Sequence, residues 1–308
     1  MKKTALAFLA VVSITMSTHA KILRVNNVNG TAPYATIQAA VNAAENGDTI
    51  MVEGSATEYD GGAINKRVVL VGPGYLLREN GIVNEADQEA IVNDLKIYGE
   101  GTVIMGLHIG GSTAVEVHAP KVVITRCRIG AWDDAVLFFK GADNCVIHQN
   151  LLTSSISSDK ETYNHLITNN LCDVLAVHSV HNSYIAYNTN YGTTGSHPGL
   201  HYCAGNKVEK NVVHREGWSD DDKDNTYIDN YVVIDFDHFS GADTDKQVLE
   251  KTNLLPADVT ENHGAFAGDD PYVISGIPAG PVIEQLMVPA SVEEGSKLNV
   301  TIKLGLQK

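Results

Sequence analysis

Residues 144–188 have the sequence NCVIHQNLLTSSISSDKETYNHLITNNLCDVLAVHSVHNSYIAYN, in which one six-residue pattern occurs three times. The copies are CVIHQN, HLITNN and SYIAYN, and they begin at residues 145, 165 and 183. Each copy places an isoleucine three positions before an asparagine. The residues around the isoleucine alternate in polarity, which is typical of a strand with one buried face. A recurring pattern of this kind indicates that the chain stacks copies of one structural unit.

The pattern continues on both sides of this stretch. Its first members follow one another at steps of 23, 20, 18, 23 and 19 residues, so the period is about twenty with insertions. A degenerate copy, Ile104 to Leu107, lies one step of 20 earlier. The six pairs are Ile124 and Cys127, Ile147 and Asn150, Ile167 and Asn170, Ile185 and Asn188, Val208 and Asn211, and Tyr227 and Asn230.

A second short strand precedes each of these strands, for example at residues 115–117 and 136–138. Two or three short strands within twenty residues leave no room for a crossover helix, so the coils must stack parallel to themselves. We therefore predict an all-β fold, a parallel β-helix. Its asparagines form a ladder in which each side chain bonds its own turn and the asparagines of neighbouring coils, and Cys127 replaces the first rung.

The amino end carries the signal of a helix. Residues 36–44, TIQAAVNAA, place their apolar side chains on one helical face, and Asn46-Gly47 ends the helix. The open end of a solenoid needs a cover, so we expect this helix to cap the first coil. The first strand is expected directly after it, at residues 48–52.

TIQAAVNAAENGDTIMV and the following RVVLVGPG resemble the cap and first coil of the pectin/pectate-lyase-like superfamily. The resemblance spans about residues 21–237 and implies a right-handed parallel β-helix with an N-terminal capping helix. That superfamily contains lyases, hydrolases, esterases, epimerases and non-catalytic binders, so it implies polysaccharide as the partner without specifying an activity. The paired-acid and Gly-His-Gly motifs of polygalacturonases, the esterase motif and the arginine-rich motif of calcium pectate lyases are all missing.

The two ends of the chain differ from the repeat. Residues 1–20 combine Lys2 and Lys3 with an apolar run and a small-residue end, which predicts a signal peptide and a periplasmic or secreted protein. No cysteine follows at the cleavage site and no apolar run is long enough to span a bilayer, so neither a lipid anchor nor membrane insertion is expected. We assign residues 21–250 to the β-helix and 251–308 to a C-terminal tail with strand-like runs at 282–288 and 298–304.

Charge and cysteines limit the partners. The formal net charge of −15 disfavours binding to nucleic acid and to anionic membranes. It would also repel an anionic glycan unless a cation bridged the two. The four cysteines fall in successive coils and are either buried small residues or a disulfide between adjacent layers. They are Cys127, Cys145, Cys172 and Cys203.

Outward side chains at equivalent places in successive coils form a row with a spacing of about 4.8 Å. Counting back from each repeat predicts one such row: His118, Lys140, Asp159-Lys160, His178, His201 and Asp220, with His181, His197 and His214-Arg215 nearby. A lyase acting on a uronate needs a base and a cation that stabilises the enolate-like charge. The residues that we assign to these catalytic roles are Lys140, Lys160, His178, His201 and Arg215. Alternatively, these are solvated surface side chains.

Two tryptophans each precede a run of acids. An exposed tryptophan suits a sugar ring stacked on its indole, and the neighbouring carboxylates suit sugar hydroxyls or Ca²⁺. The alternative is that each tryptophan covers a loop. A zinc site shared by His178 and His181, or by His197 and His201, is a further alternative. The predicted substrate-binding residues are Trp132, His118, His181 and Trp218, and the predicted metal ligands are Asp133, Asp134, Asp220 and Asp221.

Hydrolysis of a glycosidic bond needs two carboxylates that flank it. The acid clusters at 133–134 and 220–222 lie several coils apart, so a lyase ranks above a hydrolase. The sequence therefore predicts an exported carbohydrate-active β-helix protein, a polysaccharide lyase or a related glycan-modifying enzyme. The alternative is a non-catalytic β-helix protein that binds glycan or serves as a surface scaffold. The expected partner is a polysaccharide or oligosaccharide. The candidate cofactor is Ca²⁺, with zinc as the further alternative.

Overall fold

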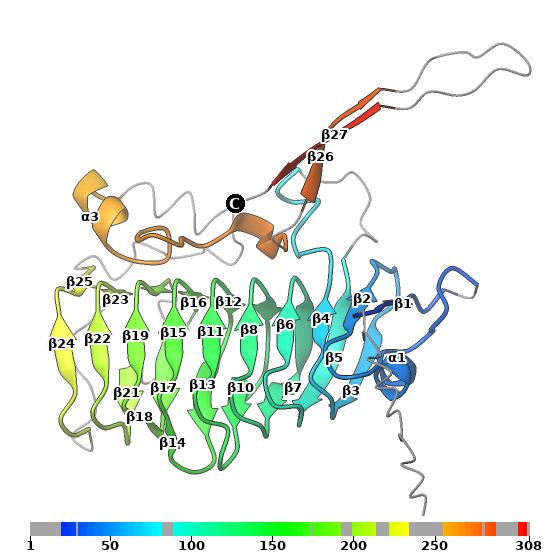
Figure 1. Ribbon diagram of the computed structural model, residues 1–308. Coiled ribbons are helices and arrows are strands. Elements are labelled where there is room, and N and C mark those ends of the chain that lie inside the picture. Colours follow the sequence, from blue (N-terminus) through cyan, green and yellow to red (C-terminus); the bar gives the residue numbers. More distant parts are fainter. Residues whose placement is uncertain are drawn as a thin grey trace, which may run out of the picture.

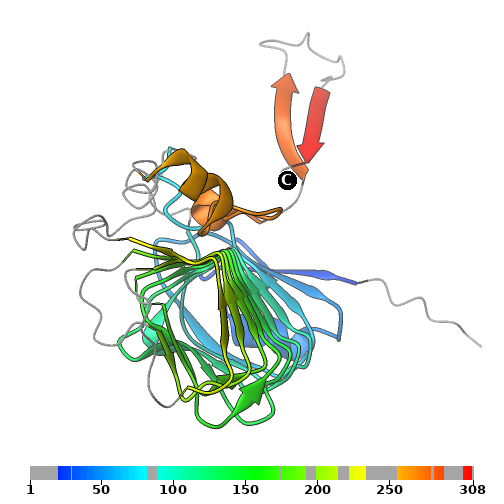
Figure 2. The ribbon, with the colours of Figure 1, turned by 90° about the vertical axis from the view of Figure 1, so that its left-hand side faces the viewer.

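The computed structural model describes residues 20–28, 30–81, 89–173, 175–191, 199–213, 222–233, 255–278, 281–287 and 301–306 (Figure 1). As predicted, the chain winds into a right-handed parallel β-helix. Its strands form a ten-stranded sheet, named sheet A, and a thirteen-stranded sheet that bends into two arms. Figure 2 looks along the axis and shows the coils lying over one another. Within the described residues, no helix is long and apolar enough to cross a membrane.

Sheet A contains one strand from each coil, and its neighbours pair in parallel. Ile147 lies directly between Ile124 and Ile167, so the isoleucines of the repeat stack in register. In order, the strands are β1 (Ile22–Val25), β2 (Thr49–Val52), β4 (Val69–Val71), β6 (Val103–Met105), β8 (Val123–Thr125), β11 (Val146–His148), β15 (Leu166–Thr168), β19 (Tyr184–Ala186), β22 (Lys207–Glu209) and β24 (Thr226–Ile228).

The second sheet divides at β7 (His108–Val117), which pairs with a strand of each arm. Before the division lie β3 (Tyr59–Ile64) and β5 (Ile91–Ile97). The first arm, B1, contains β9 (Arg128–Ile129), β12 (Leu151–Leu152), β16 (Leu171–Cys172), β20 (Thr189–Asn190), β23 (Val212–Val213) and β25 (Tyr231–Val232). The second arm, B2, contains β10 (Asp134–Phe138), β13 (Ser155–Ser158), β17 (Ala176–His178) and β21 (Gly199–His201).

Three corners connect these strands in every coil. The A/B1 corner carries the asparagines of the repeat, for example at residues 149–150. The B1/B2 corner includes residues 130–133. The B2/A corner carries loops such as 118–122 and 139–145, together with the short pair β14 (Thr162–Tyr163) and β18 (Val180–His181).

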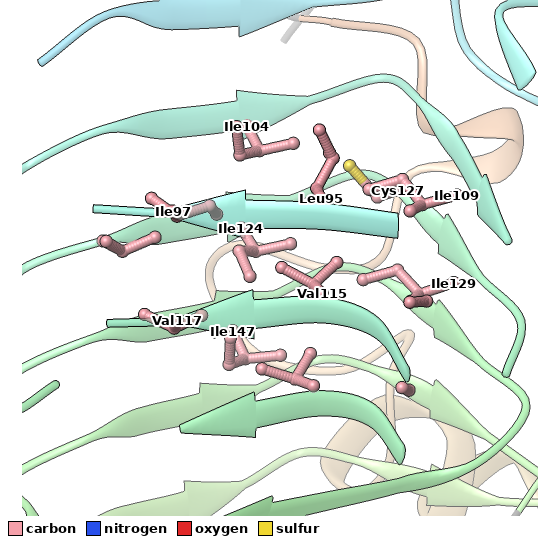
Figure 3. Close-up of a cluster of buried hydrophobic side chains, with 14 of the residues drawn as sticks. Leu95, Ile97, Ile104, Ile109, Val115, Val117, Ile124, Cys127, Ile129 and Ile147 are labelled. Carbon is pink, nitrogen blue, oxygen red and sulfur yellow. The ribbon is translucent and has the colours of Figure 1, made fainter. Parts of the chain in front are cut away.

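The interior is a column of apolar side chains. Ile104, Ile124 and Ile147 are fully buried and lie one above another on sheet A, facing Val115 and Ile129 of the second sheet (Figure 3). Full burial of such a side chain contributes about 2 kcal/mol. Because every coil adds the same layer, residues about twenty apart in sequence become neighbours.

The asparagine ladder is present as predicted and runs along the A/B1 corner. The backbone N–H and the side-chain Nδ2 of Asn170 both donate to Asn188 Oδ1, at 3.0 and 2.9 Å, and Nδ2 also donates to a carbonyl of the preceding coil. Asn150 and Asn211 repeat this arrangement. Cys127 stands in the first rung, where its N–H donates to Asn150 Oδ1 at 2.9 Å.

The amino end matches the predicted cap with one correction. Helix α1 (Ile37–Ala43) buries Ile37, Ala40 and Val41, and the Thr36 hydroxyl accepts a hydrogen bond from its first turn at 3.1 Å. The first strand, however, is not the one at residues 48–52. Strand β1 precedes the helix and pairs with β2, because the alternating segment at 22–25 has its own buried face.

The C-terminal tail lies along the A/B1 corner. It contains α3 (Ala257–Asn262), the 3₁₀-helix η2 (Ile274–Gly276) and an antiparallel hairpin of β26 (Pro281–Met287) and β27 (Thr301–Leu306). Val259 and Tyr272 of the tail pack against Leu151 and Leu171 of arm B1 in a second buried cluster. Figure 1 shows the hairpin extending away from the coils.

Candidate functional site

The predicted row of outward side chains is wrong in its register. His118 stacks on Tyr98 and on Phe139, with ring centroids 4.5 and 3.9 Å apart. Its neighbour in the next coil is therefore Phe139 and not Lys140. The cause is that the loops of the B2/A corner differ in length from coil to coil, so counting back from the asparagine does not reach equivalent places.

His178 and His201 form a separate column on the outer face of arm B2. They are register partners on β17 and β21, and their rings stack at 4.7 Å. The pairing of β17 with β13 places Ser157 level with His178, and Lys160 follows in the next loop. Of the predicted row, the structure therefore brings together these two histidines but does not bring them into line with Lys140 or Lys160.

The other predicted residues are dispersed. Lys140 and Lys160 are exposed on loops of the B2/A corner. His181 lies on β18, with its ring 5.4 Å from that of Tyr163 on β14. Arg215, Trp218, Asp220, Asp221 and His197 lie outside the described residues, so the roles assigned to them stay predictions.

Trp132 is the most exposed large apolar side chain of the described chain. It lies at the B1/B2 corner with 91% of its surface accessible, so the alternative that it covers a loop is wrong. The next residue fixes the backbone there: Asp133 N–H donates to the Ser112 carbonyl at 3.0 Å, and the Ser112 hydroxyl donates to Asp133 Oδ2 at 2.8 Å. Ser154 also donates its hydroxyl to the Asp133 carbonyl.

A shallow cavity of about 330 Å³ lies beside the indole. Gly111, Gly130, Ala131 and Thr153 line it together with Trp132, so the surface beside the ring is open rather than filled by side chains. Gly111 has a φ of +136°, which residues with a side chain rarely adopt, so glycine is favoured there. We name the surface of Trp132, Asp133, Gly111, Gly130 and Thr153 the tryptophan shelf.

Asp134 lies at the start of β10, next to the tryptophan shelf. Its Oδ1 atom accepts hydrogen bonds from the Ser155 and Ser157 hydroxyls at 2.7 and 2.5 Å. Across the described ranges, no group of three or more His, Cys, Asp or Glu side chains is arranged to hold a metal ion. The predicted ligands Asp133 and Asp134 each bond serines of neighbouring coils, and their role as metal ligands stays a prediction.

A cleft of about 490 Å³ lies between the outer face of sheet A and the tail. Leu166 and Tyr184 form part of its floor, and Asp269 and Asp270 lie at its tail side. His148 bridges the two walls, because its Nε2 lies 3.1 Å from Asp270 Oδ2. Sequence reasoning missed this cleft, since nothing in the repeat links residues 122 positions apart.

The cysteines do not take part in surface chemistry. All four are buried with free thiols, which agrees with the small-residue interpretation and not with a disulfide between layers. Burial raises the pKa of Cys127 and Cys145 to about 12. A thiol with such a pKa is neutral at ordinary pH and is a poor nucleophile or metal ligand.

The fold places this chain among the parallel β-helix proteins. No family model, curated protein or solved structure matches it.

Proposed function

We propose that the protein is an exported, carbohydrate-binding β-helix protein of the pectate-lyase-like kind, and that it holds a polysaccharide against the tryptophan shelf. The observation that carries this proposal is the exposure of Trp132, 91% of its surface, on a corner tied down by hydrogen bonds. An exposed indole is unfavourable in water, and the backbone next to it is held by the hydrogen bonds of Asp133.

The chemistry of the tryptophan shelf suits a sugar ring. A pyranose has an apolar C–H face, which stacks on an indole, and a rim of hydroxyl groups, which need hydrogen-bond partners. Thr153 lines the cavity beside the indole, and the exposed Asp133 is the next residue along the chain, so both could accept or donate such bonds. The neighbouring glycines leave space for a chain that continues past the ring.

A second candidate function is cleavage of the bound glycan by a lyase reaction. The observation that favours it is the stacked pair His178 and His201, one coil from the hydrogen-bonded pair Ser157 and Asp134. An imidazole there would take the proton beside a uronate carboxylate, and Lys140 or Lys160 would supply positive charge. This reaction requires that the loops of the B2/A corner bring one lysine toward the histidines.

Calorimetric titration with pectin, alginate and a glycosaminoglycan, each with and without a chelator, tests binding. We expect at least one polysaccharide to bind, Trp132→Ala to weaken it about tenfold or more, and Trp132→Phe to retain most of the affinity. Tyr202→Ala is the matched control, because Tyr202 is also exposed, at 63%, but lies on the turn after β21. Equal affinity of Trp132→Ala and the wild type would disprove the proposal.

Ultraviolet absorbance of the same mixtures separates binding from cleavage. A lyase produces unsaturated ends, so absorbance rises with time, and His178→Ala should slow that rise while leaving the calorimetric affinity nearly unchanged. A bound glycan with flat absorbance would identify a non-catalytic binder. Sequencing the amino terminus of the secreted protein, expected at Lys21, tests export.

A further inference from the structure

Cationic side chains gather at the B2/A corner of the first coils. A cavity of about 640 Å³ lies there, and its lining includes Lys66, Arg67, Lys121, Tyr98 and Glu100. Three of these groups are positive and one is negative, whereas the whole chain has a net charge of −15. We name this cavity the basic corner pocket.

The structure fixes two of the three cations. Lys66 Nζ donates to the carbonyls of Asn42 and Ala44 at 2.8 and 2.6 Å, at the C-terminal end of α1. Lys121 Nζ lies 2.7 Å from Glu100 Oε1. Both ammonium groups are thus positioned at the pocket, and Lys121 is partly neutralised by its partner.

Arg67 is the third cation of the pocket. It makes no ion pair within 4.0 Å with any residue that the structure describes, and the nearby Glu100, whose pKa is lowered chiefly by its hydrogen bond to Lys121 and further by the charge of Arg67, bonds Lys121 instead. The backbone of Arg67 is fixed, because its N–H donates to Asn46 Oδ1 at 2.9 Å and its carbonyl accepts from Gly47 at 2.7 Å. Its aliphatic stem passes Gly101, where a Cβ atom would lie 3.5 Å from Arg67 Cδ. The planar guanidinium suits two oxygens of a carboxylate or sulfate.

An aromatic surface begins at the edge of the pocket. Tyr98 is 47% exposed, and His118 and Phe139 continue the stack over the next two coils. Glu116 lies beside this stack but is bonded by Lys96 at 2.8 Å and by His118 at 3.0 Å. A sugar held at Arg67 would therefore meet an aromatic face along the solenoid axis.

We propose that the basic corner pocket binds the carboxylate or sulfate of an acidic sugar, with Arg67 as the main contact and Tyr98 against the ring. This inference rests on the proposed glycan binding and specifies its substrate class, an anionic polysaccharide. An acidic chain repels such a polymer over most of its surface. The pocket supplies the local positive charge that makes binding of an anionic polymer feasible without a bridging metal.

The test compares a uronate polymer, a sulfated glycosaminoglycan and a neutral glucan by calorimetry in chelator. We expect the wild type to prefer one acidic polymer, and Arg67→Gln to weaken that affinity about tenfold while leaving binding of the neutral glucan unchanged. The affinity should also fall as salt rises, and less steeply for the variant. Lys223→Gln is the matched control, since it removes the same charge from an exposed lysine in the last described coil.

The outcomes separate this inference from the proposed function. Loss of binding in Trp132→Ala with no effect of Arg67→Gln would leave glycan binding standing and overturn the basic corner pocket. The reverse result would support the pocket and remove the tryptophan shelf from the site. Equal losses in Arg67→Gln and Lys223→Gln, or a neutral glucan bound as tightly as the acidic polymers, would also overturn it. Matching thermal midpoints confirm that the variants fold.

Discussion

The A/B1 and B2/A corners both carry an internal ladder, but they are built differently. At the A/B1 corner, Asn150, Asn170, Asn188, Asn211 and Asn230 bond one another through identical atoms. At the B2/A corner, the backbone N–H of each rung also donates to a side chain of the next coil, but the accepting residue type differs from coil to coil. Its acceptors are His165 Nδ1 at 3.3 Å, Ser183 Oγ at 2.8 Å, Asn206 Oδ1 at 2.8 Å and Asn225 Oδ1 at 2.9 Å.

This difference shows which corner keeps one structure in every coil and which corner varies from coil to coil. The A/B1 turn has one length in these coils, so one residue type satisfies every rung, and the tail packs over it. The B2/A loops change length, and any acceptor that reaches the neighbouring N–H is sufficient. The basic corner pocket and the stack of Tyr98, His118 and Phe139 lie at this second corner. Two of the surface features described above therefore lie at the corner whose internal ladder varies.

Breaking the asparagine ladder at the A/B1 corner should have the largest effect on the free energy of unfolding. Asn188→Ala removes the acceptor of the Asn170 N–H and Nδ2 and the donors to the Ile167 carbonyl and Asn211 Oδ1. Each buried polar group left without a partner costs about 1–3 kcal/mol, so the free energy of unfolding should fall by about 4 kcal/mol or more. Urea unfolding followed by far-ultraviolet circular dichroism measures the loss.

The last rung is the matched control for this variant. Asn230 is only half-buried, and its Nδ2 donates to the Val208 carbonyl but to no further asparagine of the described chain, so Asn230→Ala should lose less than half as much stability. Similar losses at the two positions would show that the ladder does not act as a continuous network.

The ladder at the B2/A corner, whose acceptors differ from coil to coil and which we name the mixed ladder, should make the stability of the protein depend on pH. His165 is 2% exposed, stacks on Phe138 at 4.3 Å, and has its pKa lowered by burial from 6.5 to about 4. Below pH 6.5 the unfolded chain binds a proton that the folded protein does not, so stability is lost as the pH falls from 6.5 to about 4. The loss amounts to about 3 kcal/mol at 1.4 kcal/mol per pKa unit. Urea midpoints at pH 7.5 and 4.5 measure it.

His165→Asn sharpens this comparison, because it places an amide acceptor in the mixed ladder. In this variant, the difference in the free energy of unfolding between pH 7.5 and pH 4.5 should shrink by most of that amount, whatever the absolute stability of the variant. His118→Asn, on the outer face of the same corner, should keep the wild-type difference. A variant at position 165 with an unchanged pH dependence would assign the acid sensitivity to another group.

The same contrast explains what the sequence could predict. The strands of sheet A and the A/B1 ladder follow from Ile124, Ile147 and Ile167, because each lies three residues before its rung. Arm B2 and the part of β7 that pairs with it are different: Val115 of β7 precedes its sheet A counterpart by nine residues, Val136 by eleven and Val177 by eight. The existence of the B2 strands was therefore predictable, but the residues that neighbour one another on their outer face were not.

The candidate site was predicted in part. The exposure of Trp132 agrees with the sequence analysis, whereas its role in binding a sugar stays a prediction. The basic corner pocket combines residues 46, 65–67, 98–101 and 121, which no short motif connects. Its cations lie in two different loops, and only the stacking of coils, with α1 against them, brings them together.

Removing a contact between the C-terminal tail and the coils should have the smallest effect on the stability of the protein. Asp270 is 71% exposed in its side chain and bonds His148 at 3.1 Å and Gln149 Nε2 at 2.8 Å. Such an exposed contact contributes about 0.5–1 kcal/mol, so Asp270→Ala should leave the urea midpoint almost unchanged. Amide hydrogen exchange should nevertheless accelerate at residues 265–272, whereas Asp269→Ala, one residue away, should leave it as it is. If Asp270→Ala destabilised the whole protein as much as Asn188→Ala does, the tail would be part of the A/B1 ladder's cooperative unit and not a separate layer over it.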